Sequence, residues 1–361
     1  MSVCSKTIFF KLMMKRIKQL VFVSVILLVI FMISLFVIRR PSYTIQTNGK
    51  LYIVNKLSSS ITVFDLFKGE KLAEFPIEVL PHEATALDNH ERVVITNYGD
   101  QTIVGKSISV INTKTNKIEK IIDLEESIRP HGIVAFPNSN NVGVVTDGGN
   151  DLVVVNVETG IVEKRISTEQ VVSHLLVLDP HKPIAYATNI NSGSVSVINL
   201  LEERVIKIIP CGKGTEGIDI TPDGKEVWVT NNKKESISVI NTETYQITDV
   251  LATGEEPLRL KFSIDGKICM VPNSRDGTIS VYDRYLKEQI KTISIPGKKN
   301  LFEKVLYHTP RPVGILMHPN GLYAFVANSN ADKIEVIDMK TFTLISTIGT
   351  GRVPDGLAFV E

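Results

Sequence analysis

The chain has 361 residues, of which 40 are Lys or Arg and 39 are Asp or Glu, so its net charge at pH 7 is +1. The first 40 residues carry seven of the basic residues and none of the acidic ones, which leaves the remainder at −6. A mildly acidic remainder lacks the basic surface that nucleic-acid binding requires, so no nucleic acid is expected as a partner. The three cysteines, Cys4, Cys211 and Cys269, predict neither a disulfide framework nor a metal motif.

The N-terminal segment differs in composition from the rest of the chain. Residues 20–38 form a charge-free run of nineteen residues, five basic residues precede it, and Arg39 and Arg40 follow it. This pattern predicts a cytoplasmic segment over residues 1–19, a transmembrane signal-anchor helix over 20–38, and the remaining chain outside the cytoplasmic membrane, periplasmic or on the cell surface. A cleaved signal peptide is the alternative, but the apolar run is long for one and no small-x-small cleavage site follows.

After a short linker over residues 39–50, one unit recurs along the chain. Its clearest copy has four runs with strand character, at residues 216–221, 226–230, 236–240 and 246–251, separated by turn sequences such as Pro222-Asp223-Gly224. The end of the second run recurs as a motif resembling Val-Thr-Asn at residues 52–55, 94–97, 144–147, 186–189, 228–231, 270–273 and 325–328. The third run also recurs seven times, so two separately counted motifs predict seven repeats.

The two ends of the repeat region complement each other. The first unit begins at its second strand, near Leu51, and the missing first strand occurs at the C-terminus as residues 354–360. Pairing the last strand with the first unit would close the array into a ring without open sheet edges. The sequence therefore predicts an all-β fold over residues 51–361, a seven-bladed β-propeller of four-stranded antiparallel blades, preceded by one transmembrane helix.

The Val-Thr-Asn endings, the Pro-Asp-Gly turns and the Ser-Val-Ile-Asn third strands resemble the YVTN family of β-propellers over about residues 50–361. This resemblance implies the fold, but it leaves the activity open, because similar propellers serve as surface-layer proteins, binding modules, lactonases and cofactor-holding domains. The repeated Asn is expected to hold the turn into the third strand through side-chain-to-backbone hydrogen bonds.

The residues that open the first strand of each blade are candidates for a site, because this strand is the innermost one in a propeller. Aligned from the repeats, two of these residues are apolar, Leu258 and Val313, and five are ionisable. Imidazole and carboxylate groups are ligands that suit divalent transition metals. We therefore predict a metal or ligand site at one end of the propeller axis, formed by His82, His131, His174, Glu216 and Asp355.

Further residues are expected on the same face. Asp147, read as a replacement of the repeated Asn, is expected near His131. The remaining ones are Arg129, Arg311, Arg352 and His308, the last of them in the insertion 296–310. The arginines would pair with the ring carboxylates or hold an anionic ligand. Three other histidines, His90, His181 and His318, are expected in solvent at the turns of the opposite face.

Three functions remain open. The first is a membrane-anchored binding or scaffold module with an envelope protein or small molecule as its partner. The second is a metal-dependent hydrolase or lyase of the lactonase type, with the three ring histidines as ligands and Glu216 or Asp355 as a further ligand or base. The third is a cofactor-holding accessory protein of an envelope redox system. Motifs for serine or cysteine nucleophiles, phosphate loops and dinucleotides are absent from the sequence.

Overall fold

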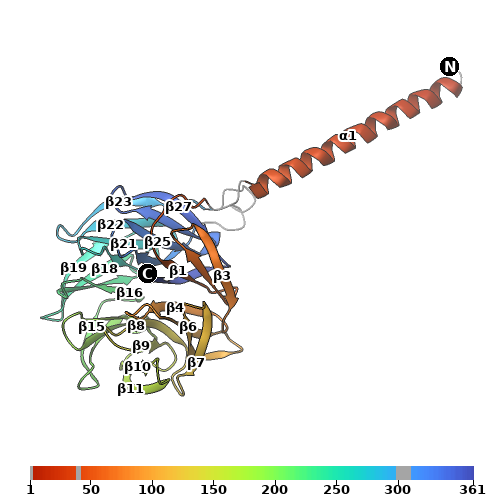
Figure 1. Ribbon diagram of the computed structural model, residues 1–361. Helices are drawn as coiled ribbons and strands as arrows, with labels where there is room; N and C mark the ends of the chain where they lie inside the picture. Colours follow the sequence, from red (N-terminus) through yellow and green to blue (C-terminus); the bar gives the residue numbers. More distant parts are fainter. Residues whose placement is uncertain (1–2, 38–41, 298–309) are drawn as a thin grey trace. The chain divides into compact units, whose positions relative to one another are not determined.

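The computed structural model describes residues 3–37, 42–297 and 310–361 (Figure 1). The chain divides into two compact units, residues 1–42 and 43–361. The insertion 296–310 falls almost entirely outside the described residues, and His308 lies in the part that is not described.

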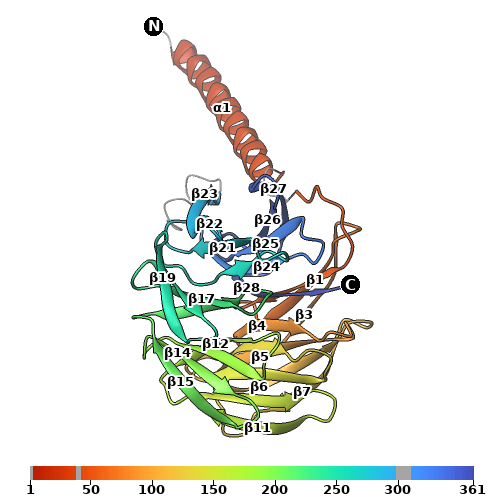
Figure 2. The same cartoon turned by 90° about the vertical axis from the view of Figure 1, so that its left-hand side faces the viewer.

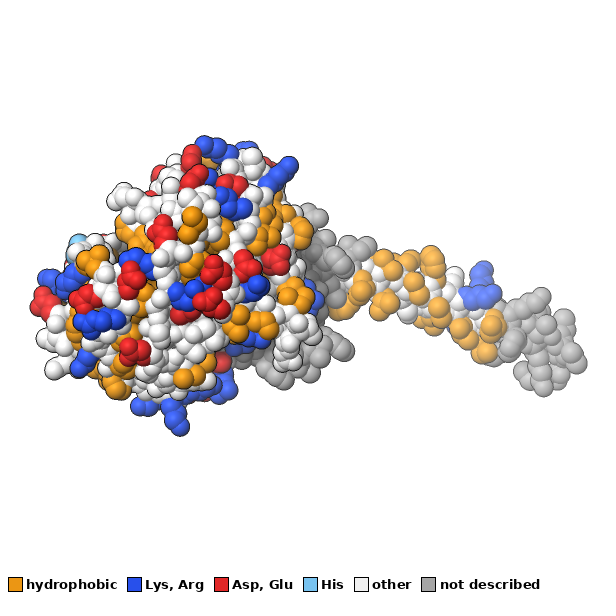
Figure 3. All heavy atoms as spheres, turned by 90° about the horizontal axis from the view of Figure 1, so that it is seen from below, with side chains coloured by type: hydrophobic (Ala, Val, Ile, Leu, Met, Phe, Trp, Pro, Cys, Tyr) orange, Lys and Arg blue, Asp and Glu red, His pale blue; other side chains and the backbone are white. Residues whose placement is uncertain are grey.

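The described part of the first unit contains one helix, α1 (Val3–Val37). Its apolar side chains from Leu20 to Met32 are mostly exposed, and Figure 3 shows them along the helix. The predicted N-terminal helix is therefore confirmed. Within the part of the chain that the structure describes, no helix meets the length and apolarity required to cross a membrane.

The described residues of the second unit form seven four-stranded antiparallel sheets, which confirms the predicted seven-bladed propeller (Figures 1 and 2). The blade at the seam holds β28 (Pro354–Val360), β1 (Lys50–Asn55), β2 (Ser60–Asp65) and β3 (Glu70–Pro76). The other blades hold, in chain order, β4 (Pro81–Ala86), β5 (Arg92–Gly99), β6 (Val104–Asn112), β7 (Lys117–Asp123); β8 (Pro130–Ala135), β9 (Asn141–Thr146), β10 (Asp151–Asn156), β11 (Ile161–Ser167); β12 (Ser173–Leu178), β13 (Ile184–Asn189), β14 (Ser194–Asn199), β15 (Arg204–Pro210); β16 (Thr215–Ile220), β17 (Glu226–Asn231), β18 (Ser236–Asn241), β19 (Gln246–Ala252); β20 (Lys261–Phe262), β21 (Ile268–Asn273), β22 (Thr278–Asp283), β23 (Glu288–Ser294); and β24 (Pro312–Met317), β25 (Tyr323–Asn328), β26 (Lys333–Asp338), β27 (Thr343–Gly349). A short 3-10 helix, η1 (Ser329–Ala331), follows β25.

The ring closes as the sequence predicts. Strand β28 pairs antiparallel with β1, with Lys50 opposite Val360 and Ile53 opposite Leu357. The innermost strands β28, β4, β8, β12, β16, β20 and β24 follow one another around the axis. Closure therefore removes the exposed edges that an open array would present to other chains.

The core lies between neighbouring blades, because each sheet buries both of its faces. Strand β17 is buried along most of its length, and Trp228 packs edge-on against Phe262 of the next blade at 5.2 Å between ring centroids. Apolar clusters of this kind join each blade to its neighbour, for example Val195 and Val197 with Val227. A single blade could not bury both faces, which is why the repeats depend on one another.

The repeated Asn side chains bond mainly to side chains of the third strand. The expected bonds to backbone occur in only some blades, for example from Asn189 Nδ2 to the Ser194 carbonyl oxygen at 3.3 Å. Asn97 Nδ2 lies 2.9 Å from Ser107 Oγ and 3.0 Å from Ser109 Oγ, both on β6. Asn231 makes the same pair of contacts with Ser236 and Ser238. The buried amide is thus satisfied by two hydroxyls of the third strand, and it ties the second strand to the third within a blade.

The third repeat is shifted by one residue relative to the sequence alignment. Pro130 lies opposite Thr146, whereas in the preceding blade Pro81 lies opposite Asn97. Thr146 therefore takes the place of the repeated Asn, and Asp147 is the residue after it. The expectation that Asp147 replaces the Asn was wrong, because the valine-rich run before it fits either register.

His318 is buried, with 4% of its surface exposed, although it was expected in solvent. The segment before β1 covers it, since its Nε2 atom lies 3.1 Å from both Thr47 Oγ1 and the Asn48 carbonyl oxygen. His181 is exposed, as the sequence predicts.

Candidate functional site

In six of the described blades a β-bulge interrupts the innermost strand near its start. In the second blade Pro81 pairs with Asn97 and Ala84 with Ile95, so His82 and Glu83 together oppose a single residue. That residue is Thr96, whose hydroxyl accepts the Glu83 N–H at 3.0 Å and donates to the His131 carbonyl oxygen at 2.9 Å. The Thr of the motif therefore fixes the bulge and links it to the next blade.

The same irregularity occurs after Pro130, Ser173, Thr215 and Pro312. It brings the five predicted ionisable residues together at one end of the axis, which we call the mouth. These residues, the ring residues, are all buried, with exposed fractions between 3% and 8%: His82, His131, His174, Glu216 and Asp355.

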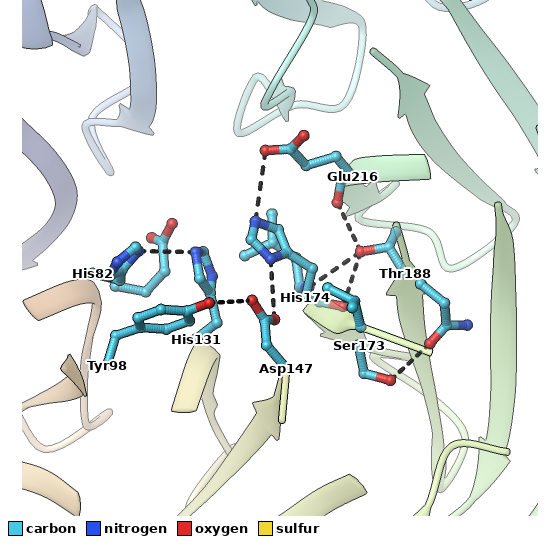
Figure 4. A network of polar contacts seen from close by, with 12 residues as sticks. His82, Tyr98, His131, Asp147, Ser173, His174, Thr188 and Glu216 are labelled. Carbon is cyan, nitrogen blue, oxygen red and sulfur yellow. Dashed lines mark hydrogen bonds and ion pairs between the residues drawn. The ribbon is translucent and has the colours of Figure 1, made fainter. Parts of the chain in front are cut away.

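The three ring histidines are in direct contact (Figure 4). His82 Nδ1 lies 2.9 Å from His131 Nε2, and the rings of His131 and His174 stack with centroids 3.6 Å apart. Such close imidazoles repel one another when protonated, so they do not all carry a charge.

His174 carries the charge. Its Nδ1 atom lies 3.1 Å from Asp147 Oδ1, and its Nε2 atom lies 3.5 Å from Glu216 Oε1. Burial alone would lower the pKa of His174, but the hydrogen bonds and charges of the two carboxylates outweigh burial and raise this pKa to about 9. The hydrogen bond from His174 and its charge, together with that of Arg259, hold the pKa of Glu216 below its usual value although burial acts the other way.

His82 and His131 are neutral at physiological pH. Burial lowers the pKa of His82, and the charges of Lys56, His174 and Arg259 lower it further. Burial and the charge of His174 lower the pKa of His131 in the same way. The mouth therefore combines a neutral imidazole pair with a fixed imidazolium.

The residue that follows the repeated Asn forms a second set of contacts at the mouth. Tyr98 stacks on His82 with centroids 4.3 Å apart and donates to Asp147 Oδ2 at 3.0 Å. Lys56 lies 3.7 Å from Asp355, and Asn232 donates its amide to Glu216. Apart from Asp147, these residues were not predicted from the sequence. Their common position, one residue after each motif, could have identified them.

A third set of residues occupies the second bulge position, which directly follows each ring residue. This position is Gly in four blades (Gly132, Gly217, Gly314 and Gly356), but it holds Glu83 and Arg259 in two blades that are not adjacent. Arg259 Nη2 lies 2.7 Å from Glu83 Oε1, and Nη1 lies 3.3 Å from Glu216 Oε1. Burial raises the pKa of the Glu83 carboxyl above its usual value, although the charge of the Arg259 guanidinium acts in the opposite direction. This ion pair was not predicted from the sequence, although a charged residue in place of a repeated Gly is a usable signal.

The arginines that were expected to pair with ring carboxylates contact other groups. Arg129 donates to the Asp100 carbonyl oxygen at 3.0 Å and lies over the Tyr98 ring. Arg311 lies 3.6 Å from Glu256, and Arg352 is exposed. Asp147 contacts His174 and Tyr98 rather than the expected His131.

The predicted metal ligands divide into two groups. Both nitrogens of His174 face carboxylates, whereas His82, His131 and Asp355 lie together, with His82 Nδ1 3.9 Å from Asp355 Oδ2. Within the described residues, no group of three or more His, Cys, Asp or Glu side chains has an arrangement that could hold a metal ion. As placed, the five ring residues do not fit one shared ion, so we derive no chemical step through a metal.

Three buried polar atoms at the mouth have no hydrogen-bond partner among the described residues: His131 Nδ1, Asn232 Oδ1 and Asp355 Oδ1. The charged groups around them are paired with one another. These three atoms are therefore where the site can accept a further molecule.

Comparison with known proteins identifies the family of the chain. The model of the family described as "Lactonase, 7-bladed beta-propeller" matches residues 38–299. Hydrazine synthase of Kuenenia stuttgartiensis superposes with a TM-score of 0.66 at 14% identity, covering 77% of this chain and 89% of that one. A functionally unknown protein from Desulfotomaculum acetoxidans DSM 771 superposes with a TM-score of 0.72 at 15% identity, covering 87% of this chain and 99% of that one. At these identities the two structures share the fold alone, and no curated protein matches the chain significantly.

Proposed function

The chain belongs to the lactonase family of seven-bladed β-propellers, and we propose that its propeller binds a small polar molecule at the mouth. The observation that carries this proposal is the set of three buried, unpartnered polar atoms on His131, Asn232 and Asp355. Leaving a buried polar atom unpaired costs about 1–3 kcal/mol, so a molecule that satisfies several of them gains affinity from each. The surrounding ion pairs hold these atoms in place, which is the preorganisation that a small-ligand site needs.

The proposed location is outside the cytoplasmic membrane, with α1 as an uncleaved anchor. The charge-free run over residues 20–38 and the basic residues before it support this location. Cell fractionation with sequencing of the mature N-terminus tests it. A membrane-bound chain that retains residues 20–38 supports the anchor, and a mature N-terminus beyond residue 38 overturns it.

A second candidate function is the hydrolysis of cyclic esters, which the neutral His82–His131 pair favours. A neutral imidazole can take a proton from water as the water oxygen attacks the ester carbonyl carbon. The ring C–O bond then breaks, and the proton passes to the leaving oxygen, giving a hydroxy acid. Arg259 and protonated His174 are cations close to this pair, and cations of this kind stabilise a developing oxyanion.

The experiment uses the purified full-length chain and three two-carbon probes: ethanolamine, ethylene glycol and glycolate. Saturation-transfer NMR detects weak binding, and we expect at least one probe to bind. Asp355→Leu, which removes one unpartnered atom, should abolish that signal, whereas His181→Ala on the opposite face should keep it. If no probe binds, or if both variants behave alike, the binding proposal fails.

Hydrolysis and metal binding are measured on the same protein. Opening of δ-valerolactone, followed by acid release, should be lost in His131→Ala if the imidazole pair acts as the base; a wild type without turnover removes this function. Elemental analysis after addition of zinc, copper or nickel tests the metal prediction. Sub-stoichiometric metal in every case removes it, and a stoichiometric metal lost in His131→Ala but kept in His181→Ala supports it.

A further inference from the structure

We propose that the mouth selects molecules that carry a positively charged ammonium group with hydrogen-bond donors, and that it excludes anions. This inference rests on the proposed binding function and names the chemical class of its ligand. Three features of the mouth carry it: the pairing of its cations, the balance of its charges and the identity of its unpartnered atoms.

Each cation at the mouth already has a carboxylate partner. Arg259 contacts Glu83 at 2.7 Å and Glu216 at 3.3 Å, and Lys56 lies 3.7 Å from Asp355. His174 is held between Asp147 and Glu216. An incoming anion would have to displace one of these carboxylates and leave it buried without its partner, which is strongly unfavourable.

The charges at the mouth do not balance. Counting the described groups that contact a ring residue directly or through Arg259, three are cations: Lys56, His174 and Arg259. Four are carboxylates: Glu83, Asp147, Glu216 and Asp355. The excess of one negative charge lies among side chains that are mostly buried, apart from Lys56, whose side chain is 31% exposed. The local dielectric constant is therefore low, and a compensating positive charge is favoured.

Two of the unpartnered atoms can only accept hydrogen bonds. Asp355 Oδ1 belongs to a carboxylate whose other oxygen faces Lys56 and His82. Asn232 donates its Nδ2 amide to the Glu216 carboxylate, which accepts only, so the orientation of the amide is fixed and Oδ1 remains an acceptor. Acceptors that lack donors require a ligand with N–H or O–H groups, and an ammonium group supplies three together with a charge.

Ethanolamine and glycolate test the chemical class of the ligand. Ethanolamine and glycolate share a hydroxyl and a two-carbon frame but carry opposite charges, and ethylene glycol is the neutral reference. We expect ethanolamine to bind the full-length chain at least about tenfold more tightly than glycolate, equivalent to about 1.4 kcal/mol. Asp355→Asn, which keeps the shape and removes the charge, should reduce ethanolamine binding more than it reduces ethylene glycol binding.

A second variant, Asn232→Leu, covers the case in which Asp355→Asn fails to fold. It removes one acceptor without changing the net charge, so it should weaken ethanolamine and ethylene glycol together. Glycolate binding as tightly as ethanolamine, with loss in Asp355→Leu, would overturn the ammonium class while leaving the binding function intact. Binding of none of the three probes would overturn the proposed function itself.

Discussion

His82 Nδ1 lies 2.9 Å from His131 Nε2, and the two buried imidazoles share this contact beside a third, protonated histidine. His174 holds the charge because it alone has a carboxylate on each nitrogen. Burial, together with the neighbouring positive charge, keeps the pKa values of the other two rings below the usual range. Protons at the mouth are therefore distributed unevenly, and the stability of the propeller should depend on pH in two opposite ways.

Acid should destabilise the propeller through His82 and His131. Their pKa values are lower in the folded chain than in the unfolded chain, so the unfolded chain binds more protons as the pH falls below about 6.5. Urea unfolding at about pH 5 and pH 7 measures the loss. His82→Asn removes one of the groups and should reduce the difference between the two conditions, whereas His181→Asn should leave it unchanged. Equal pH dependence in both variants would contradict the neutral pair.

High pH should destabilise the propeller through His174. Because its folded pKa is raised to about 9, its contribution is fully present below about pH 6.5 and is lost as the pH rises through 9. We expect His174 to contribute about 3 kcal/mol to the free energy of unfolding below about pH 6.5. Asp147→Asn removes one carboxylate and should lower the pKa of His174, which an NMR titration of the ring nitrogens measures directly. Glu91→Gln, on an exposed pair with Lys114, is the matched control and should not move it.

The repeat motif was sufficient to predict the number of blades, the closure by β28 and the five ring residues, because each depends on strand order and not on side-chain detail. Arg259 and Glu83 were missed for a physical reason. Alternation along a regular strand directs the residue after a ring residue to the other face. The bulge suspends this alternation, so the second residue also reaches the axis. A bulge has no characteristic residue composition, so it cannot be recognised from the sequence of a single repeat.

Asp147 was misplaced for a different reason. Val144, Val145 and Thr146 have similar strand propensity, so the sequence fits two registers that differ by one residue. A hydrogen bond distinguishes the two registers, because the Thr146 hydroxyl donates to the Asp151 carboxylate across the turn. The shift places Asp147 beside His174, where its carboxylate, together with that of Glu216, raises the pKa of His174.

Arg259 links two blades that are far apart in the sequence, and removing it should be costly. Arg259→Met leaves the buried Glu83 carboxylate without its partner and removes one of the cations beside Glu216, which keeps His174 and Asn232. We expect a loss of about 3–5 kcal/mol in the free energy of unfolding. The double variant Glu83→Gln with Arg259→Met should recover part of this loss, because one stranded charge is also removed. Urea denaturation of the two single variants and the double variant forms the cycle. Additive losses would show that the two side chains do not interact.

Gly356, on the closing strand β28, lies against the neighbouring innermost strand. A Cβ atom built there would be 2.4 Å from the His82 carbonyl oxygen and 2.7 Å from Glu83 Cα, both backbone atoms that cannot move aside without shifting β4. Gly356→Ala should therefore push β28 away from β4 and lower the free energy of unfolding by at least about 2 kcal/mol, in the range found for overpacked cores.

Gly321 provides the control for this prediction. Its φ of +72° makes Ala unfavourable there, but no atom lies within 4 Å of an added Cβ. Gly321→Ala should thus cost only the backbone strain of about 1–2 kcal/mol, and it should leave the mouth unchanged. Gly356→Ala should also alter the NMR signals of His82, since its carbonyl is the group displaced. If the two variants lose the same stability and neither changes His82, close packing at the seam does not determine how the ring residues are held.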